Sequence, residues 1–427
     1  MKILEKCLDS REINKFALPL ILTNIGQIVI SQLALHFAVN NSSLALSGIS
    51  IIQNLLFAFG GLLGAFSLSF NIKGAKEYAN NRFDRFYDLL KSSLVIDLII
   101  GVIFATFILF FGRVVLSGFY GFRGALLNLS TIYLKIMSPY ILLTLINFSL
   151  TNLLRVQKKT ESIMAIGLGS SLLDVLLNSI LVPKLGITGA ALSAIISLSV
   201  ISLSYLILVY PVILNALPVK STTKLELITF GLPLAGQEVL ESVLFIMVFD
   251  ALIARLGVSI LAIYSVVSQL LSIARIPSFV YSTTISVFLP EAEKGGKVKQ
   301  FLKLIFTSSY IATLIISVIV VFASNALAHF LSDEIVTNIM PITLFTLIMM
   351  GMSPVYEGTK MLLQSSDDEK YVLSHSIIIN LLSVGIMLII QLLGRQTYYS
   401  MYFIYGLSLL LLSILFMKRY LQKCTAV

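Results

Sequence analysis

The stretch Leu89–Phe111 reads LLKSSLVIDLIIGVIFATFILFF, and its only charged residues are Lys91 and Asp97. A helix needs about 20 apolar residues to cross the hydrocarbon core of a bilayer. Because backbone polar groups in lipid must be paired within the segment, a stretch of this length is expected to be helical. The stretch therefore predicts a membrane-spanning helix.

Apolar stretches of similar length recur along the chain and predict eleven further spans. They are 16–37, 49–70, 132–154, 163–182, 187–210, 227–252, 259–287, 302–323, 339–362, 372–393 and 399–416. The chain of 427 residues is 57% hydrophobic and 12% charged, whereas soluble domains are about a quarter charged. This composition excludes a soluble enzyme, a disordered chain and a nucleic-acid binder, despite a formal net charge of +9. We expect an all-α polytopic membrane protein with twelve transmembrane helices.

The distribution of basic residues predicts the orientation of these helices. Most of the 30 Lys and Arg residues fall in loops on one side of the membrane. The other side holds only Arg113, Arg123, Lys184, Arg255 and Arg395. Since basic loops stay in the cytoplasm, both termini are expected to be cytoplasmic in a plasma membrane, and the short loops favour a bacterial inner membrane.

The two halves of the chain resemble each other. Leu18-Pro19-Leu20 recurs as Leu232-Pro233-Leu234, and Ser50-Ile51-Ile52 recurs as Ser265-Val266-Val267. The near-constant separation predicts a duplication into two pseudo-symmetric six-helix bundles, 1–215 and 216–427, around a central cavity. Such an arrangement suits alternating access and favours a transporter. Pro19 and Pro233 are interpreted either as hinges or as helix starts.

Three acidic residues lie in the predicted span 227–252: Glu238, Glu241 and Asp250. Ionisable groups inside a membrane are costly and are functional candidates by default. Glu238 and Glu241 share one helical face, so their mutual repulsion favours an ion-coupling site for H⁺ or Na⁺. The alternative is that one of them pairs with a basic residue on another helix. Arg275, in span 259–287, is the expected charge partner, either as a structural neutraliser or as a counterion that protonation releases.

A second candidate ion site lies in the predicted span 163–182. Asp174 and Asn178 are one helical turn apart and offer oxygen ligands suited to Na⁺ or a proton. The alternative is hydrogen bonding between helices. Asp97, Lys135, Asp250 and Glu357 are assigned to positions nearer the span ends, where a charged group reaches the interface at low cost. Ser353, Glu357 and Asp250 are kept as candidates for the substrate cavity or as charge partners.

The chain contains no Gly-rich phosphate-binding loop followed by Lys and Ser or Thr, and no His-Glu-x-x-His pair. ATP-driven chemistry and a metalloprotease site are therefore not expected. We predict no enzyme activity, no cofactor and no metal site beyond Na⁺ at Asp174 and Asn178. The expected partners are a small organic molecule and the lipid bilayer, without nucleic acid, and the expected assembly is a monomer.

Several short motifs occur in an order that resembles the multidrug and toxic compound extrusion (MATE) family, within the multidrug/oligosaccharidyl-lipid/polysaccharide flippase superfamily. They are Ala17-Leu18-Pro19, Lys73-Gly74-Ala75, Leu154-Arg155, the run LGITGAAL at 185–192, Gly231-Leu232-Pro233 with Glu241 and Phe245, and Leu256-Gly257 with Leu261-Ala262. The resemblance implies two six-helix bundles around a substrate cavity. It also implies export of amphipathic, often cationic, organic compounds driven by entry of Na⁺ or H⁺.

The resemblance also assigns residue roles, with two departures. Glu241 falls where many members place a cation-coupling Glu, and Asp174 and Asn178 fall where others carry an Asn and an Asp in that order. The Asp that many members carry in the first span would fall near Ala34, where this chain has no acid. The Asp often found in the tenth span would fall near Ser353, with Glu357 one turn further on.

The favoured function is a secondary active antiporter in which Glu241, helped by Glu238, and separately Asp174 bind the coupling ion. The main alternative is a flippase for a lipid-linked saccharide or another lipid, which would line its cavity with basic residues. Arg275 is the main basic residue expected at mid-membrane and acids outnumber it, so the antiporter is favoured. A dedicated exporter of one natural product, or a non-transporting assembly or sensor subunit, would also fit the sequence.

Overall fold

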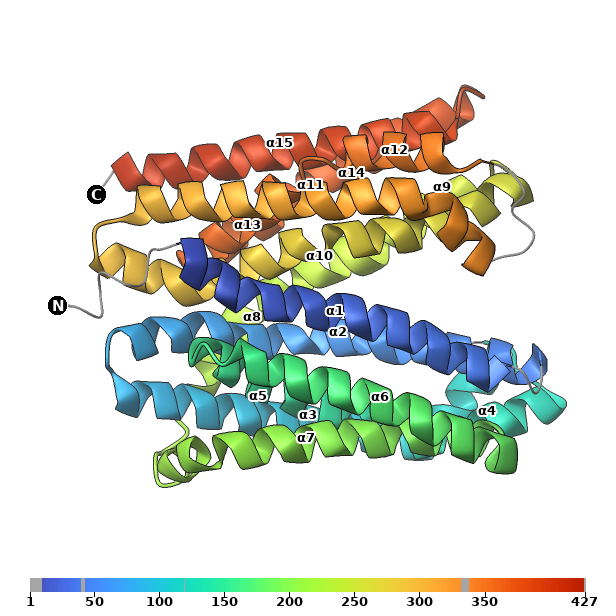
Figure 1. The fold of residues 1–427 in the computed structure, drawn as a ribbon, viewed down its shortest axis with the longest axis horizontal. Coiled ribbons are helices and arrows are strands. Elements are labelled where there is room, and N and C mark those ends of the chain that lie inside the picture. Colours follow the sequence, from blue (N-terminus) through green and yellow to red (C-terminus); the bar gives the residue numbers. More distant parts are fainter. Residues whose placement is uncertain (1–9, 40–42, 119, 332–337, 426–427) are drawn as a thin grey trace. The chain divides into compact units, whose positions relative to one another are not determined.

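The computed structural model describes residues 10–39, 43–118, 120–331 and 338–425, and every regular element in these ranges is a helix (Figure 1). The elements of the first half are α1 (Ser10–Val39), α2 (Ser43–Ala79), α3 (Phe83–Gly118), α4 (Gly124–Ile136), α5 (Tyr140–Val156), α6 (Thr160–Leu185) and α7 (Ile187–Ala216). Those of the second half are α8 (Lys224–Glu238), the π-helical segment η2 (Val239–Phe245), α9 (Ile246–Ala254), α10 (Val258–Lys294), α11 (Val298–Leu331), α12 (Met340–Met349), α13 (Ser353–Ser365), α14 (Glu369–Leu392) and α15 (Tyr398–Thr425).

Each of the twelve predicted spans falls on one helix or on consecutive helical segments. Eight spans of the described chain are long and apolar enough to cross a membrane by length and hydropathy alone. They are Phe83–Gly118, Gly124–Val156, Thr160–Leu185, Ile187–Ala216, Ile263–Lys294, Val298–Ala326, Glu369–Leu392 and Tyr398–Lys423. The other four predicted spans fall on α1, on α2, on α8–η2–α9 and on α12–α13.

Two spans are broken in the same way, which adds to the evidence for duplication. The break between α4 and α5 carries Met137-Ser138-Pro139, and Met352-Ser353-Pro354 joins the end of the break between α12 and α13 to the start of α13. The two motifs are 215 residues apart, as are Ser50 and Ser265. Pro cannot donate a helical hydrogen bond and clashes with the preceding turn, so each motif interrupts its span at an equivalent point.

The chain forms two compact units. Leu22–Ala235 form the N-terminal unit, and Gly236–Val427 together with Met1–Ile21 form the C-terminal unit. Each boundary therefore falls two residues after one of the repeated prolines, Pro19 or Pro233. Both prolines lie inside helices that begin nine residues earlier, at Ser10 and Lys224. The interpretation of these prolines as helix starts is therefore wrong, and the hinge interpretation stays a prediction.

The core of the N-terminal unit joins α2, α3, α4, α5 and α7. Ile52, Leu56, Ile108, Tyr133 and Leu145 are among its fully enclosed side chains. Close packing of α3 on α5 depends on glycine. A Cβ on Gly101 would lie 2.6 Å from the Cα of Leu142, a distance that the backbone of α5 cannot relieve by a side-chain rotation.

The core of the C-terminal unit combines aliphatic packing with an aromatic cluster. Val266, Val267 and Leu270 of α10 pack near Val320 of α11. Phe249 of α9 contacts the rings of Tyr402 and Tyr405 on α15, with ring centroids 5.1 and 5.5 Å apart. The start of α1 joins this unit, because the Tyr281 hydroxyl donates to Asn14 Oδ1 at 2.6 Å.

Large apolar side chains also cover the outside of both units. Phe110 on α3 and Phe322 on α11 are each 75% exposed, and Leu392 on α14 is 85% exposed. Contiguous apolar exposure of this kind is unfavourable in water and is expected where a helix faces lipid tails. The exposed apolar faces therefore support a bilayer as the surrounding medium.

We expect Gly101→Ala to destabilise the N-terminal unit, because the added methyl group overlaps the backbone of α5. Overpacking of this kind costs about 1–3 kcal/mol, which thermal unfolding in detergent will report as a lower midpoint. Gly169→Ala in α6 is the matched control, since nothing lies within 4 Å of its added Cβ. An unchanged midpoint for Gly101→Ala would contradict the described packing of α3 on α5.

Outside the spans, ion pairs of Asp368 connect the loop between α13 and α14 to the end of α15. Asp368 Oδ2 pairs with Arg419 Nε at 2.9 Å and with Lys423 Nζ at 3.2 Å. Partial burial opposes ionisation of this carboxyl, but the hydrogen bonds from Arg419 and Lys423 outweigh it and lower the pKa of Asp368. A lowered pKa stabilises the folded state at neutral pH, and this stabilisation is lost as the pH falls through the folded-state value.

Asp368→Asn should therefore lower the thermal midpoint at neutral pH, by the equivalent of about 0.5–1 kcal/mol for an exposed pair. The difference from wild type should shrink as the pH falls below about 4, where the unfolded Asp also gains its proton. The double variant with Arg419→Gln should lose little more than Asp368→Asn alone. A difference that persists in acid would rule out the ion pair as its cause.

Candidate functional site

Glu241 lies in the π-helical segment η2, between α8 and α9 in the C-terminal unit. A π-helical turn holds one more residue than an α-helical turn, and such turns are frequent at functional sites. Oε1 of Glu241 accepts hydrogen bonds from the Gln237 amide and from the Tyr356 hydroxyl. Gln237 also donates to the Ser376 hydroxyl at 2.8 Å. The Glu241 carboxylate is thereby held by groups from α8 and α13, and Ser376 of α14 contacts it only through Gln237.

The second oxygen of Glu241 is paired with a lysine that links two acids. Lys360 Nζ lies 3.0 Å from Glu241 Oε2 and 2.9 Å from Glu357 Oε2. Arg275 Nη2 lies 3.2 Å from the other oxygen of Glu357. We call Glu241, Lys360, Glu357 and Arg275 the charge cluster. It contains two acids and two bases, so its formal charge is balanced when all four groups are ionised.

The charge cluster differs from the sequence-based expectation in two respects. Glu357 was assigned to a position near a span end, where a charge costs little free energy. Its side chain is instead only 3% exposed, and both of its oxygens are paired. Arg275 was expected to face Glu238 or Glu241, and instead it pairs with Glu357. Lys360 was not among the candidate residues named from the sequence. The spacing of Glu357 and Lys360, three residues apart on one helix, was the signal in the sequence that these two side chains can pair.

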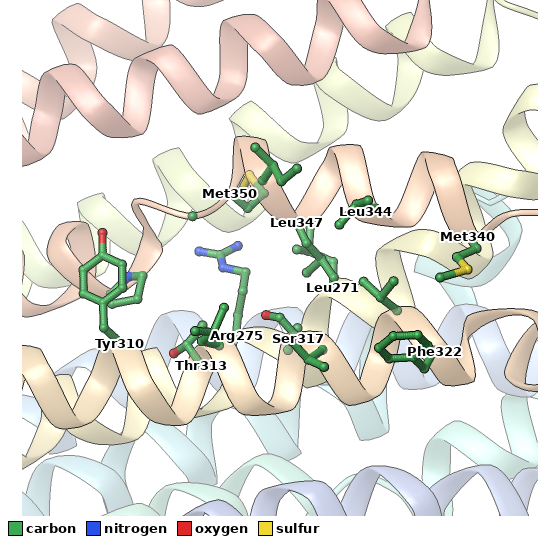
Figure 2. A pocket seen from close by; sticks show the side chains of 17 residues that line it. Leu271, Arg275, Tyr310, Thr313, Ser317, Phe322, Met340, Leu344, Leu347 and Met350 are labelled. Atoms are coloured by element: carbon green, nitrogen blue, oxygen red, sulfur yellow. The ribbon is translucent and has the colours of Figure 1, made fainter.

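Arg275 also borders a cavity of about 410 Å³ between α10, α11, α12 and α13. Figure 2 shows the guanidinium of Arg275 between Tyr310 and Leu347. The rest of the lining is almost wholly apolar, including Leu271, Phe322 and Leu344. Nε of Arg275 is buried and has no hydrogen-bond partner among the described residues. An apolar cavity with one polar group at its wall can accommodate an amphipathic molecule.

The remaining candidates of this unit lie apart from the charge cluster. Glu238 is half-buried and makes no hydrogen bond or ion pair with a described residue. Asp250 accepts a hydrogen bond from the Tyr264 hydroxyl, next to the aromatic cluster. Ser353 is buried, and its hydroxyl donates to the Met350 carbonyl at 2.7 Å, where it closes the break between α12 and α13.

Asp174 lies in α6 of the N-terminal unit and lines a smaller cavity. This cavity of about 170 Å³ is also bordered by Gln27, Tyr140, Ser170 and Ser197, among others. Ser193 of α7 donates to Asp174 Oδ1 at 2.8 Å. The Asn178 amide donates to the main-chain carbonyl of Asp174 at 2.9 Å. The predicted pair is therefore close in space, although the amide nitrogen of Asn178 is turned toward the backbone.

Two further expectations can be compared with the structure. No group of three or more His, Cys, Asp or Glu side chains within the described ranges is arranged to hold a metal ion. Asp97 was expected near an interface, but its side chain is completely buried in the N-terminal unit. That expectation is wrong because a position along a span does not determine the face on which a side chain lies. Ala34, near which the first-span acid is missing, has a side chain outside the described part of the chain.

The chain is similar in sequence and in fold to known membrane transporters. The MatE family model matches residues 19–180. The chain is similar over its full length to a MATE structure in complex with MaL6, with a TM-score of 0.86, 14% identity and coverage of 99% of that chain. It is also similar to a MOP superfamily transporter from Pyrococcus furiosus Vc1, with a TM-score of 0.84, 14% identity and coverage of 100% of this chain and 98% of that one.

A third solved structure is an outward-facing multidrug resistance MATE family transporter of the MOP superfamily. It matches with a TM-score of 0.84 at 14% identity, covering 98% of this chain and 96% of that one. None of the curated protein sequences compared with the chain matches it.

The twelve predicted spans thus form the fold of the solved MATE transporters over the full length of the chain. Residues 19–180 resemble the MatE family in sequence, and the whole chain resembles solved MATE structures in fold. The resemblance predicted from the sequence motifs is thereby confirmed.

Removing Lys360 should destabilise the C-terminal unit, because Glu241 and Glu357 would then share only Arg275. Breaking a buried ion pair from one side typically costs about 3–5 kcal/mol. The loss for Lys360→Met, measured as the thermal midpoint in detergent, should be larger at alkaline than at acidic pH, where one acid takes up a proton. Adding Glu357→Gln should recover part of the loss. Lys370→Met removes an exposed lysine as the control, and equal losses for the two lysine variants would contradict the pairing.

Proposed function

We propose that the protein is a secondary active antiporter that exports amphipathic, cationic organic compounds in exchange for an inward-moving cation. The observation that carries this proposal is the position of Glu241, an acid inside a predicted span whose charge is matched by a lysine and whose other oxygen accepts two hydrogen bonds. Protonation of Glu241 would leave Lys360 paired only with Glu357 and would give the charge cluster a net positive charge. An ion binding here therefore changes the forces between η2 and α13.

The contacts of Glu241 favour H⁺ over Na⁺ at this site. A sodium ion would need the oxygen face of Glu241 that the Lys360 ammonium occupies at 3.0 Å. A proton instead binds one carboxylate oxygen and needs no further ligands. Asp174 differs, because its neighbours are the Ser193 hydroxyl and other neutral groups. Oxygen ligands of this kind suit Na⁺ as well as H⁺, so both ions are kept for Asp174.

The two prolines provide the hinges of the proposed transport cycle. Pro19 and Pro233 interrupt one backbone hydrogen bond each within α1 and α8. Each lies two residues before a boundary between the compact units. Bending at these points would allow the units to move without unwinding either helix along its length.

A flippase for a lipid-linked saccharide or another anionic lipid is the second candidate. Lys360 favours it, because the charge cluster contains two bases rather than Arg275 alone, so acids do not outnumber bases there. The similar transporter from Pyrococcus furiosus Vc1 is described as having a binding pocket of reverse polarity that suggests a different function. The antiporter is preferred because both bases are already neutralised by Glu241 and Glu357.

The setting proposed for this activity follows the charge distribution of the loops. We place the chain in the plasma membrane of a bacterial cell as a monomer with both termini in the cytoplasm. In this orientation the coupling ion enters from outside and the substrate leaves the cell.

The test is ethidium efflux from cells expressing the wild type, Glu241→Gln or Asp174→Asn, with the Na⁺ and H⁺ gradients collapsed separately. We expect Glu241→Gln to reduce efflux to the background rate, because a neutral amide cannot exchange an ion. Collapse of the H⁺ gradient should have the same effect on wild type. Glu238→Gln is the control and should keep efflux, since Glu238 has no partner among the described residues.

Efflux that survives in Glu241→Gln would reject Glu241 as the coupling acid. If no variant, including the wild type, moves dye under any gradient, drug export is wrong for this chain. The flippase, the dedicated exporter of one natural product and the non-transporting subunit would then be tested in its place.

A further inference from the structure

Asp97 is an acid at the centre of the N-terminal unit to which the proposed function gives no role. Its side chain on α3 has an exposed fraction of 0%. The Ser67 hydroxyl of α2 lies 3.1 Å from Oδ1 and 3.2 Å from Oδ2. The Ser149 hydroxyl of α5 donates to Oδ2 at 2.5 Å. Asp97 is thus held where three helices meet, by two hydroxyl groups.

The groups around Asp97 form a buried polar network that extends through Asn152 to Arg155, whose Nη1 lies 3.4 Å from Asn152 Oδ1. The Ser93 and Ser149 hydroxyls lie 2.7 Å apart, and either can donate to the other. The Asn152 amide donates to the main-chain carbonyl of Ser67 at 2.9 Å. All of these side chains except Arg155 are buried, so Asp97 itself is separated from solvent.

A negative charge on Asp97 has no cationic partner in the described part of the chain. Within the described ranges it forms no ion pair with any Lys, Arg or His. The charged side chains on the helices packed against it make other contacts or lie elsewhere on their helices, and α7 carries none. They are Lys73, Lys76 and Glu77 on α2, Asp84, Arg85, Asp88, Lys91 and Arg113 on α3, Lys135 on α4 and Arg155 on α5.

Tight helix packing leaves this carboxyl without access to water. Gly101, one turn along α3, brings the α5 backbone so close that an added Cβ would lie 2.6 Å from the Cα of Leu142. Gly64 on α2 likewise packs against the ring of Phe148 on α5, at 2.6 Å for an added Cβ. An isolated carboxylate in such surroundings is destabilised by several kcal/mol, and the group adopts its neutral form instead.

We propose that Asp97 binds H⁺ in this conformation and is a protonation site of the N-terminal unit. This site would provide in α3 the acid that the chain lacks near Ala34. Loss of the proton would place an unpaired charge between α2, α3 and α5, so the ionised form favours a state in which these helices separate and water enters. A role of this proton in transport rests on the proposed antiport. The binding of the proton to Asp97 does not depend on that proposal.

The hydroxyl contacts indicate the direction in which a proton leaves Asp97. Ser149 connects Asp97 to Ser93, which lies one turn nearer the start of α3. By the orientation predicted from the basic loops, that end of α3 faces the cytoplasm. Hydroxyl groups can donate and accept a proton together, so Ser149 and Ser93 can take up a proton that Asp97 releases when these helices separate and water enters.

Proton binding can be measured on the purified full chain without any transport assay. Infrared spectra at neutral pH should show a buried, protonated carboxylic acid in the wild type, and Asp97→Asn should remove that band. Asp88→Asn is the matched control on the same helix; Asp88 accepts hydrogen bonds from the backbone N–H groups of Thr222 and Thr223, and its substitution should leave the band in place. A band that persists in Asp97→Asn, or is absent from wild type, overturns the proposal.

A second variant keeps the test decisive if Asp97→Asn does not fold. Ser149→Ala retains the acid but removes a donor that favours its ionised form. The carboxylic acid band should then shift in frequency and persist to higher pH than in wild type. An unchanged band in Ser149→Ala would assign the band to another residue and overturn the proposal. A band that NaCl abolishes in wild type, while KCl does not, would replace the proton site by a sodium site.

Transport assays separate this inference from the proposed function. If Asp97 couples to transport, Asp97→Asn will slow ethidium efflux although it mimics the protonated form, because it cannot release a proton. Full efflux in Asp97→Asn together with loss of the band would limit Asp97 to a structural proton and overturn its coupling role. If Glu241→Gln keeps efflux while the Asp97 band is present, the proposed coupling at Glu241 fails and proton binding at Asp97 stands.

Discussion

The pairing of Lys360 with both Glu241 and Glu357 is the interaction on which the C-terminal unit depends. Each acid alone would be strongly unfavourable inside a span, and the lysine alone equally so. Together with Arg275 they form a group whose charges cancel, so the cluster can be buried. The same balance makes the stability of the cluster sensitive to protonation. One added proton or one lost partner leaves a net charge at a position where water cannot solvate it.

The N-terminal unit meets the same constraint with hydroxyl groups rather than with ion pairs. Asp97 is held by Ser67 and Ser149, and Asp174 by Ser193. Hydroxyl donors stabilise a carboxylate less than a lysine does, so acids in such surroundings exchange protons with the medium more readily when access opens. The two units therefore hold these buried acids by different means.

The sequence predicted the membrane-spanning helices well, because the length of an apolar stretch is a local property of the chain. It failed at the partners of the charged residues. Lys360 and Glu241 are 119 residues apart, and nothing in either neighbourhood indicates that they meet. Asp97 shows the same limit. Its position along a predicted span can be taken from the sequence, but the face of α3 on which it lies cannot. Such information resides in the packing of several helices at once.

Local changes at Glu241 can reach the boundary between the units through a single stretch of chain. Gln237, which donates to Glu241, follows Pro233 by about one helical turn, and the boundary between Ala235 and Gly236 lies between them. Because Pro233 already lacks one backbone hydrogen bond, this part of α8 resists bending less than its neighbours do. A proton on Glu241 weakens its attraction to Lys360 and alters the hold of Gln237. The resulting change in forces on Gln237 acts on α8 near Pro233, where this helix bends most easily.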